Sequence, residues 1–316
     1  MRHRRSAVAA AVARFAARFA VAASAVTATA ATASAQRVGA AVPSASPPDS
    51  MVVTTAWLAA HLGDPKVVQI EVTMDDKPTD GRIPGARQLP YSAFVTRRDG
   101  LSTEFPAVDS LRVRFEALGI SSDTRVVVYA MHGPMATRVL MSLEFIGHRK
   151  FSYLDGGLTK WKAEGRALTR DAPAITRGSL TPRPQPGILA SAEWITDRLG
   201  KPGLALIDTR TDGEYLGTGN RSGMPSAGHL AGARQLEWES LFERDEVTLK
   251  DRAELRRLFA DRVRPGDTVV TYCWVGYRAS ATYFAARMLG YDTKLYDGSY
   301  QDWQIRTLPT TAGATP

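Results

Sequence analysis

Short apolar runs alternate with helical stretches between residues 51 and 310, and this pattern predicts an α/β fold. In the second half, Ala205-Leu206-Ile207 and Thr268-Val269-Val270-Thr271-Tyr272 are predicted strands, and 192–199 and 252–259 are predicted helices. Strands that alternate with helices form a mostly parallel sheet flanked by helices on both faces. Ligands of such sheets bind outside the carboxyl ends of the strands, so we expect the chemistry there.

The pattern occurs twice along the chain. Matching segments keep their order in both halves, which chance would not preserve, and they indicate one duplication rather than an array of short repeats. The matches are Gly85-Ala86-Arg87-Gln88-Leu89 with Gly232-Ala233-Arg234-Gln235-Leu236, Val127-Val128-Tyr129-Ala130 with Val270-Thr271-Tyr272-Cys273, Gly133 with Gly276, Asp155-Gly156 with Asp297-Gly298, and Trp161 with Trp303.

The repeats define two domains of ordinary size, 51–170 and 188–310. Residues 171–187 contain four prolines, which lack a donor N–H and stiffen the chain, so this segment is predicted to be a linker. Residues 36–50 are rich in Pro, Ser and Ala and are predicted to be disordered. The tail after Pro309, with 311–316 beyond the second domain, is predicted to be similar.

Residues 1–35 are predicted to be a signal peptide. Met1-Arg2-His3-Arg4-Arg5 is a basic start, an Ala/Val/Phe-rich stretch follows, and Ala33-Ser34-Ala35 has the small-residue pattern of a cleavage site before Gln36. The alternative is a membrane anchor, but the uninterrupted apolar stretch is short and only weakly hydrophobic. The mature protein is therefore expected to be exported to a periplasm without stable membrane insertion. Arg4-Arg5 does not decide between the Sec and Tat routes.

Most of the net positive charge of the chain lies in this segment. The whole chain has 40 Lys and Arg against 32 Asp and Glu, a charge of +8, but five of the arginines lie in the first 35 residues. The remaining 35 basic and 32 acidic residues leave +3. No lysine-rich run or basic stripe interleaved with aromatic residues indicates a nucleic-acid partner.

The candidate nucleophile is Cys273, the only cysteine of the chain. It follows a predicted strand and opens the loop Cys273-Trp274-Val275-Gly276-Tyr277-Arg278, before a helix predicted from Arg278 to Leu289 with Gly290 as its C-cap. Unpaired N–H groups at a helix start, the helix dipole and the charge of Arg278 all favour a thiolate over a thiol. The alternative is a buried structural cysteine.

These residues together resemble the tandem-domain rhodanese-type sulfurtransferases. The second half carries the family's marks: Asp208-Thr209-Arg210, Glu214-Tyr215, Gly228-His229-Leu230-Ala231-Gly232-Ala233, Tyr272-Cys273 and Tyr296-Asp297-Gly298-Ser299. The resemblance covers essentially the whole mature chain. It implies that the first domain is catalytically silent, and Ala130 indeed stands where the second domain has Cys273.

The resemblance also implies a mechanism, in which the Cys273 thiolate takes the outer sulfur of a donor as a persulfide and passes it to a thiophilic acceptor such as cyanide or a thiol. Loop amides from Trp274 to Arg278 would stabilise the anionic persulfide, and Gly276 would allow the tight curl. No cofactor and no metal is required. Phosphatases that share the fold use Cys-x5-Arg, whereas Cys273-x4-Arg278 is one residue shorter and better suits a sulfur atom.

The donor is either thiosulfate, which we favour, or 3-mercaptopyruvate. Trp274 and Val275 stand where thiosulfate enzymes typically carry basic residues, and Arg278 stands in a loop where mercaptopyruvate enzymes carry small residues. Trp274 is predicted to flank the entrance. Arg210 and Arg221 match carboxylate-binding positions of the mercaptopyruvate type, although each could equally be a surface arginine or form a structural ion pair.

A histidine and two tryptophans of the repeats are expected to have structural roles. His229 precedes a Gly-Ala turn, and a structural hydrogen bond is expected for it rather than a role as base; Trp161 and Trp303 are expected to pack in the core. A different class of function stays open: the chain could be a persulfide carrier or a partner-binding module without turnover. The paired domains make a monomer plausible.

Overall fold

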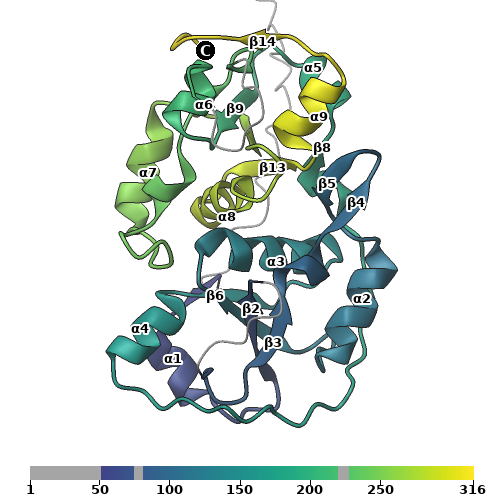
Figure 1. The fold of residues 1–316 in the computed structure, drawn as a ribbon, viewed down its shortest axis with the longest axis vertical. Coiled ribbons are helices and arrows are strands. Elements are labelled where there is room, and N and C mark those ends of the chain that lie inside the picture. Colours follow the sequence, from purple (N-terminus) through teal and green to yellow (C-terminus); the bar gives the residue numbers. More distant parts are fainter. Residues whose placement is uncertain (1–50, 75–80, 220–227) are drawn as a thin grey trace, which may run out of the picture. The chain divides into compact units, whose positions relative to one another are not determined.

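Residues 51–74, 81–219 and 228–316 are described in the computed structural model. The first half of this region forms a five-stranded sheet in which every pairing is parallel (Figure 1). In spatial order its strands are β1 (Val52–Val53), β7 (Phe151–Leu154), β6 (Arg125–Ala130), β2 (Val67–Thr73) and β3 (Arg87–Pro90).

The second half forms another five-stranded parallel sheet with the corresponding order. Its strands are β8 (Leu189–Ala190), β13 (Asp292–Tyr296), β12 (Thr268–Tyr272), β9 (Leu204–Asp208) and β11 (Arg234–Gln235). The predicted α/β fold with two copies of a mostly parallel sheet is therefore confirmed. The strand predictions at 205–207 and 268–272 fall within β9 and on β12.

Both faces of each sheet are covered, which explains why the strands read as continuous apolar runs. In β6, Val126 and Val128 face a cluster that contains Leu111 and Leu140, whereas Val127 faces a second cluster that contains Trp161. Alternate side chains of a strand point to opposite faces, so one strand supplies two cores.

Helices and short hairpins connect the strands. The first half contains α1 (Thr55–Ala60), η1 (Tyr91–Phe94), the antiparallel pair β4 (Thr96–Arg98) and β5 (Leu101–Glu104), α2 (Val108–Ala117), α3 (Gly133–Phe145) and α4 (Gly157–Ala163). The second half contains η2 (Pro186–Ile188), α5 (Ala192–Thr196), α6 (Asp212–Leu216), η3 (Trp238–Leu241), α7 (Arg252–Ala260), α8 (Ala279–Leu289) and α9 (Ser299–Ile305), with β10 (His229–Leu230) and β14 (Thr310–Thr311).

Local sequence fixes the helix ends. The side chains of Ser191 and Asp251 accept N–H groups of the first turns of α5 and α7, so these helices begin where an N-cap residue stands. α8 ends at Gly290, which has φ 93°, as the C-cap prediction required. α5 ends at Thr196, earlier than the predicted 199.

The prediction of an unstructured tail after Pro309 is wrong for the residues that follow it directly. Thr310–Thr311 forms β14, which pairs antiparallel with β10. The carbonyl of Thr315 then lies 3.0 Å from Nε2 of His229. Backbone pairing stabilises this segment, and such pairing leaves no signal in side-chain composition.

The proline-rich segment 171–187 runs along the first domain and is bonded to it. The N–H groups of Gly178 and Arg183 donate to the carbonyls of Glu116 and Ile146, each at 2.8 Å. The N–H of Leu180 donates to the Glu116 carboxylate at 3.1 Å, and Leu180 is itself buried.

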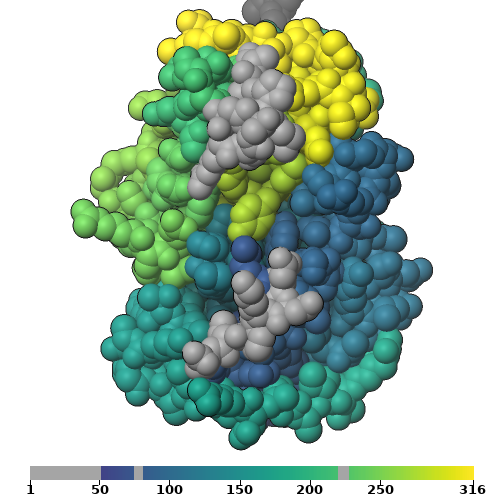
Figure 2. Space-filling model, viewed as in Figure 1, coloured from purple at the N-terminus to yellow at the C-terminus, as the bar shows by residue number. Residues whose placement is uncertain are grey.

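The two halves are in contact through α3 and α8, which lie side by side in the middle of Figure 1. Thr137 of α3 and Ser280 of α8 are joined by a buried hydrogen bond of 2.9 Å between their hydroxyl oxygens. In the space-filling view, residues of the first half (purple to teal) and of the second half (green to yellow) meet along a shared boundary (Figure 2). This boundary places the first domain beside the cysteine loop of the second.

Candidate active site

Cys273 is the first residue after β12, and five loop residues separate it from the start of α8. Its side chain is completely buried and belongs to an apolar cluster with Phe105, Tyr283 and Leu295. Its N–H donates to the hydroxyl of Ser299 at 3.2 Å. Ser299 adopts φ 52°, an unusual value for a residue other than glycine, so the chain accepts local strain to place this hydroxyl.

Cys273 lies at the floor of a cavity of about 660 Å³. The walls come from both domains, so the first domain takes part in shaping the site. The first domain contributes Met74, Tyr91, Thr103, His132 and Met135, and the second contributes Trp238, Glu239, Glu246 and the loop residues Trp274, Val275, Tyr277 and Arg278.

Four loop carbonyls are hydrogen-bonded to groups outside the loop. The N–H of Tyr300 donates to the carbonyl of Cys273 at 3.1 Å, and the N–H of Gln301 donates to that of Trp274 at 3.0 Å. The hydroxyls of Thr103 and Ser280 donate to the carbonyls of Val275 and Tyr277, the latter at 2.8 Å.

The orientation of these carbonyls fixes that of the amides. In a trans peptide the N–H points opposite to the C=O of the same unit. The N–H groups of Trp274, Val275 and Gly276 therefore turn inward, and they donate to no protein acceptor in the described chain. Several unpaired N–H groups that converge at the start of a helix form a site for an anion, such as the terminal sulfur of a persulfide.

Gly276 is the residue that allows this curl. It has φ +78°, which favours glycine. A Cβ atom at this position would lie 2.7 Å from the carbonyl oxygen and 3.1 Å from Oδ1 of Asp297. Both the backbone angle and the close approach of Asp297 exclude a larger side chain.

Arg278 lines the cavity, but its charge is already paired. Its two terminal nitrogens each lie 2.8 Å from an oxygen of Glu214. Burial alone would raise the pKa of Glu214, but the hydrogen bonds and charge of Arg278, helped by Thr211, lower it to about 2. Arg278 is thus held beside Cys273 by a carboxylate that stays ionised.

Arg210 lies in the core, in the ion-pair arrangement considered above as the alternative. It is fully buried, its Nη2 lies 2.6 Å from Oδ2 of Asp208, and its guanidinium stacks over Tyr300 with 3.9 Å to the ring centroid. It is not among the residues that line the Cys273 cavity. Its predicted role in binding a donor carboxylate stays a prediction. Arg221 lies outside the described residues.

The remaining loop residues are arranged in different ways. Trp274 lines the cavity but is only 8% exposed, and its ring packs against Tyr300 at a centroid distance of 5.2 Å. Tyr277 meets Tyr91 of the first domain edge to face at 5.2 Å. Val275 accepts the hydroxyl of Thr103. Two of these three contacts come from the first domain.

The first domain lacks a comparable loop. Only Met131 and His132 separate Ala130 from α3, and the N–H of Gly133 donates to the carbonyl of Glu246 at 2.9 Å. The place of an anion is therefore occupied by a backbone carbonyl of the other domain. The catalytic silence of the first copy stays a prediction.

Sequence reasoning missed the residues that the first domain contributes, because no motif marks them. Arg138 of α3 is completely buried and donates to Oδ1 of Asp297 at 2.7 Å and to the carbonyl of Thr103 at 2.6 Å. Its guanidinium lies 3.6 Å from the ring centroid of Phe105. An arginine in the middle of a buried helix face is the one sequence signal that could have indicated it.

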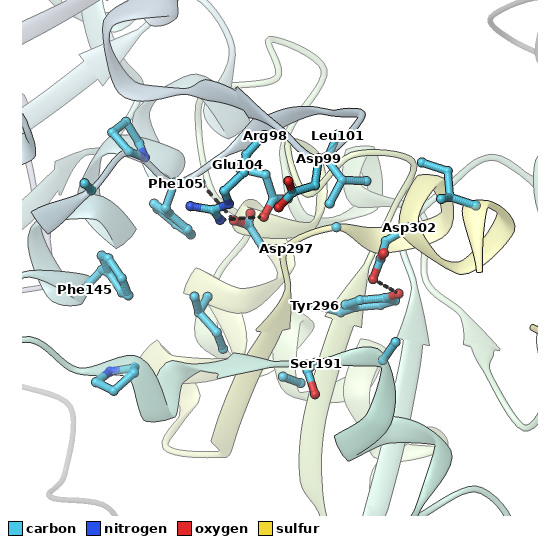
Figure 3. A pocket seen from close by; sticks show the side chains of 18 of the residues that line it. Arg98, Asp99, Leu101, Glu104, Phe105, Phe145, Ser191, Tyr296, Asp297 and Asp302 are labelled. Atoms are coloured by element: carbon cyan, nitrogen blue, oxygen red, sulfur yellow. Dashed lines mark hydrogen bonds and ion pairs between the residues drawn. The ribbon is translucent and has the colours of Figure 1, made fainter.

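A second cavity, of about 780 Å³, is lined by Glu104, Phe105 and Asp297 among others (Figure 3). Figure 3 shows Glu104 close to Asp297, with Phe105 beside them. The N–H of Phe105 donates to Asp297 at 3.0 Å, and Arg98 pairs with Glu104 at 3.0 Å. Burial, and next the charge of Asp297, raise the pKa of Glu104 to about 7.

His229, Trp161 and Trp303, for which structural roles are predicted, are bonded to backbone carbonyls. Nδ1 of His229 bonds to the carbonyl of Tyr215 at 2.9 Å, and the two rings stack. Trp161 and Trp303 are buried, and each donates its indole N–H to a backbone carbonyl at 2.9 Å. Within the described ranges, no cluster of His, Cys, Asp and Glu could hold a metal ion, and no helix is long and apolar enough to span a bilayer.

Comparison with known proteins agrees with this geometry. The sequence profile described as "Rhodanese-like domain" matches residues 54–164 and again 191–306. Thiosulfate sulfurtransferase from Pseudomonas aeruginosa is 33% identical over 258 residues, which cover 80% of this chain and 93% of that protein. Sulfur carrier protein TtuD from Thermus thermophilus is 32% identical over 270 residues, with coverage of 80% and 93%.

A solved structure supports the same assignment. SseA from Escherichia coli, whose structure is described under the rhodanese fold and the mechanism of 3-mercaptopyruvate sulfotransferases, matches with a TM-score of 0.70 and 25% identity. The match covers 79% of this chain and 99% of SseA. Two matches to one family profile, together with these relatives, show that the chain is a two-domain member of the rhodanese family of sulfurtransferases.

Proposed function

We propose that the second domain transfers a sulfane sulfur from a small anionic donor, thiosulfate in the first place, to a thiophilic acceptor such as cyanide or a thiol. Cys273 carries the sulfur as a persulfide. The observation that carries this proposal is the loop itself: its carbonyls are bonded outward and its amides turn inward around the buried sulfur.

The loop acts mainly on charge. The persulfide left after the first step is an anion, and prearranged N–H donors stabilise an anion without having to reorganise. Arg278 and the N-terminus of α8 add positive potential, although Glu214 offsets the full charge of the guanidinium.

Thiosulfate is favoured over 3-mercaptopyruvate because of the surroundings of the two arginines. Arg278 is paired with Glu214, and Arg210 is paired with Asp208 and does not line the cavity, so the described cavity walls hold no unpaired guanidinium for a donor carboxylate. A carboxylate-bearing donor needs such a partner more than a compact dianion that fits the amide ring. A relative named thiosulfate sulfurtransferase points in the same direction.

The test is sulfur transfer by the purified mature protein, with thiosulfate or 3-mercaptopyruvate as donor and cyanide as acceptor. We expect thiocyanate formation with thiosulfate, and its loss in Cys273→Ser. Faster turnover with 3-mercaptopyruvate would mean that 3-mercaptopyruvate, and not thiosulfate, is the preferred donor. Trp274→Ala tests the entrance role of that residue: an unchanged ratio of the two donor rates would remove Trp274 from donor selection.

A persulfide carrier is the second candidate, and the resemblance to a protein named sulfur carrier favours it. A carrier would still form one persulfide on Cys273 but would turn over slowly with every small donor. A single-turnover measurement separates the two: full persulfide loading with negligible steady-state rate supports the carrier. A pure binding module would keep its partner in Cys273→Ser.

Export is part of the proposal, since residues 1–35 have the pattern of a cleaved signal peptide. Fractionation of expressing cells with N-terminal sequencing tests it: a periplasmic protein that begins at Gln36 is expected. We also propose that the mature protein is a monomer, because the two domains already bury their shared face within one chain. Light scattering at a mass of two chains would contradict this.

A further inference from the structure

Three hydrogen-bond donors, carried by residues that line the Cys273 cavity, have no acceptor among the described protein atoms. They are the hydroxyl of Tyr91 and the indole N–H groups of Trp238 and Trp274, and all three donor atoms are buried. Buried polar groups are nearly always paired, and an unpaired one costs about 1–3 kcal/mol. Three in one cavity indicate a site whose ligand supplies the acceptors.

The chemistry of these groups restricts the ligand. An indole N–H donates and never accepts, so two of the three positions require an acceptor. Burial raises the pKa of Tyr91, and the nearby Cys273 sulfur raises it further against the opposing charge of Arg138, so its hydroxyl keeps the proton and can donate. The ligand therefore carries several acceptor atoms close together.

The charges around the cavity point to a compact anion. Arg278 and the inward amides lie at the floor with Cys273, whereas the carboxylates of Glu239 and Glu246 also line the cavity. Glu246 is bonded to His132 at 2.9 Å, and Glu239 is exposed. An extended anion whose carboxylate reached these two residues would be repelled, but an oxyanion held next to the sulfur would not.

Tyr91 and Trp238 occupy corresponding positions in the two copies. Each stands two residues after the leucine of the repeated Ala-Arg-Gln-Leu segment. Tyr91 begins η1 and Trp238 begins η3, and both lie against the same cavity. The duplication thus contributes one residue with an unpaired donor from the equivalent position of each domain to the cavity lining.

We propose that Tyr91, Trp238 and Trp274 form the oxyanion subsite for the sulfur donor and bind the sulfonate oxygens of thiosulfate. The proposal rests on the function proposed above and names the part of the site that recognises the donor. In thiosulfate the oxygens are two bonds from the outer sulfur, which suits donors that belong to the same cavity lining as the nucleophile. In 3-mercaptopyruvate the carboxylate oxygens are four bonds from the sulfur.

The step balances without a further reactant. The Cys273 thiolate forms a bond to the outer sulfur, and the bond between the two sulfur atoms of thiosulfate breaks. Its electron pair leaves with the sulfonate sulfur, so that sulfite departs and Cys273 keeps a persulfide anion. Charge on the leaving sulfite oxygens grows in this step, and the three donors stabilise it where it develops.

The test compares two donors in Tyr91→Phe and Trp238→Phe: thiosulfate, and an organic persulfide that has no sulfonate. Each variant removes a single donor and keeps an aromatic ring. We expect kcat/KM for thiosulfate to fall about tenfold or more, as for a lost hydrogen bond to a charged group, and kcat/KM for the organic persulfide to stay unchanged. Tyr291→Phe and Trp194→Phe, which lie outside the cavity, are matched controls.

Two readouts separate this proposal from the function on which it rests. An equal fall with both donors, or no fall with thiosulfate, overturns the subsite while Cys273-dependent turnover continues. Absence of Cys273-dependent turnover with either donor in the unmodified protein overturns the function itself. Calorimetric titration of Cys273→Ser with thiosulfate then tests the subsite alone: binding that is not weakened by Tyr91→Phe also overturns it.

Stability gives a check that is independent of activity. A buried hydroxyl without a partner is unfavourable, so Tyr91→Phe should leave the melting temperature of the ligand-free protein unchanged or raise it. A marked decrease would mean that the hydroxyl serves the fold, and would contradict its assignment to the donor.

Discussion

Arg138 of the first domain and Asp297 of the second form a buried ion pair of 2.7 Å, and both contact the place where Gly276 bends the cysteine loop. A Cβ on Gly276 would lie 3.1 Å from Oδ1 of Asp297 and 3.4 Å from Nη1 of Arg138. The first domain therefore supports the loop through Arg138, and its Tyr91 and Thr103 contact the loop residues Tyr277 and Val275. Each of these contacts can be tested separately.

Arg138→Met is expected to destabilise the protein by about 3–5 kcal/mol, because it leaves the Asp297 carboxylate buried without its partner. Denaturant unfolding measures this. The double variant Arg138→Met with Asp297→Asn should be less destabilised than the sum of the two single variants, since it removes both charges. A single-variant cost below about 1 kcal/mol would show that the pair contributes little.

Gly276→Ala is expected to lower kcat/KM on the order of a hundredfold, because the loop amides must move to relieve the contact with Asp297. Gly232→Ala is the matched control: Gly232 has a similar φ of +82°, but no atom lies within 4 Å of a Cβ built there. Gly232→Ala should cost about 1–2 kcal/mol of stability from backbone strain alone and leave the rate unchanged. Equal loss of rate in both variants would count against a specific role for Asp297.

Glu104 makes the stability depend on pH. Its pKa is raised to about 7 in the folded protein, so between pH 4.5 and 7 the folded state retains a proton that the unfolded state has lost. Stability from this group therefore falls as pH rises through that range, by up to about 1.4 kcal/mol per pH unit, and changes no further above it. The variant Glu104→Gln should not show this decrease of stability with rising pH.

The measurement is urea unfolding of both proteins at pH 5, 6, 7 and 8. The stability of Glu104→Gln relative to the unmodified protein should increase up to pH 7 and then level. The exposed Glu243→Gln serves as control and should show no such increase. Parallel pH profiles for Glu104→Gln and the unmodified protein would mean that Glu104 ionises normally.

Ala130→Cys in a Cys273→Ser background should restore no sulfur transfer. The first domain has only two residues between position 130 and α3, and the N–H of Gly133 is already bonded to Glu246. A cysteine there would meet no ring of free amides. Cysteine-dependent thiocyanate formation by this double variant would show that a nucleophile alone is sufficient.

The fold and the position of the cysteine loop between a strand and a helix could be predicted because both depend on local pattern. The order of residues shows the continuous apolar strands, the glycine that ends α8 and the segment Cys273–Arg278. The sequence left an ion pair open for Arg210, and the structure shows it with Asp208, two residues earlier. The partner of Arg278 could not be predicted, since Glu214 lies far from it in sequence. Composition could not reveal β14 either, because backbone bonds alone hold Thr310 and Thr311 to β10.

The contribution of the first domain was hidden for a different reason. Tyr91, Thr103 and Arg138 lie far from Cys273 in sequence, and no spacing rule links them to it. Only the packing of α3 against α8 brings them to the loop. The repeat pairs Tyr91 with Trp238, but this correspondence becomes informative only when both are seen to line one cavity.

The hydrogen bond between Thr137 and Ser280 has a consequence for how the chain is built. Each residue stands four positions after the corresponding glycine, Gly133 or Gly276, so the two are equivalent. Equivalent residues touch each other only on a dyad, as in the isologous interface of a homodimer. The bonds from Leu249 N–H to Asp155 and from Phe105 N–H to Asp297, each 3.0 Å, repeat this relation away from the axis. Covalent fusion keeps the symmetric interface but lets each half carry different substitutions, so one half can lose its nucleophile and still serve as a subunit.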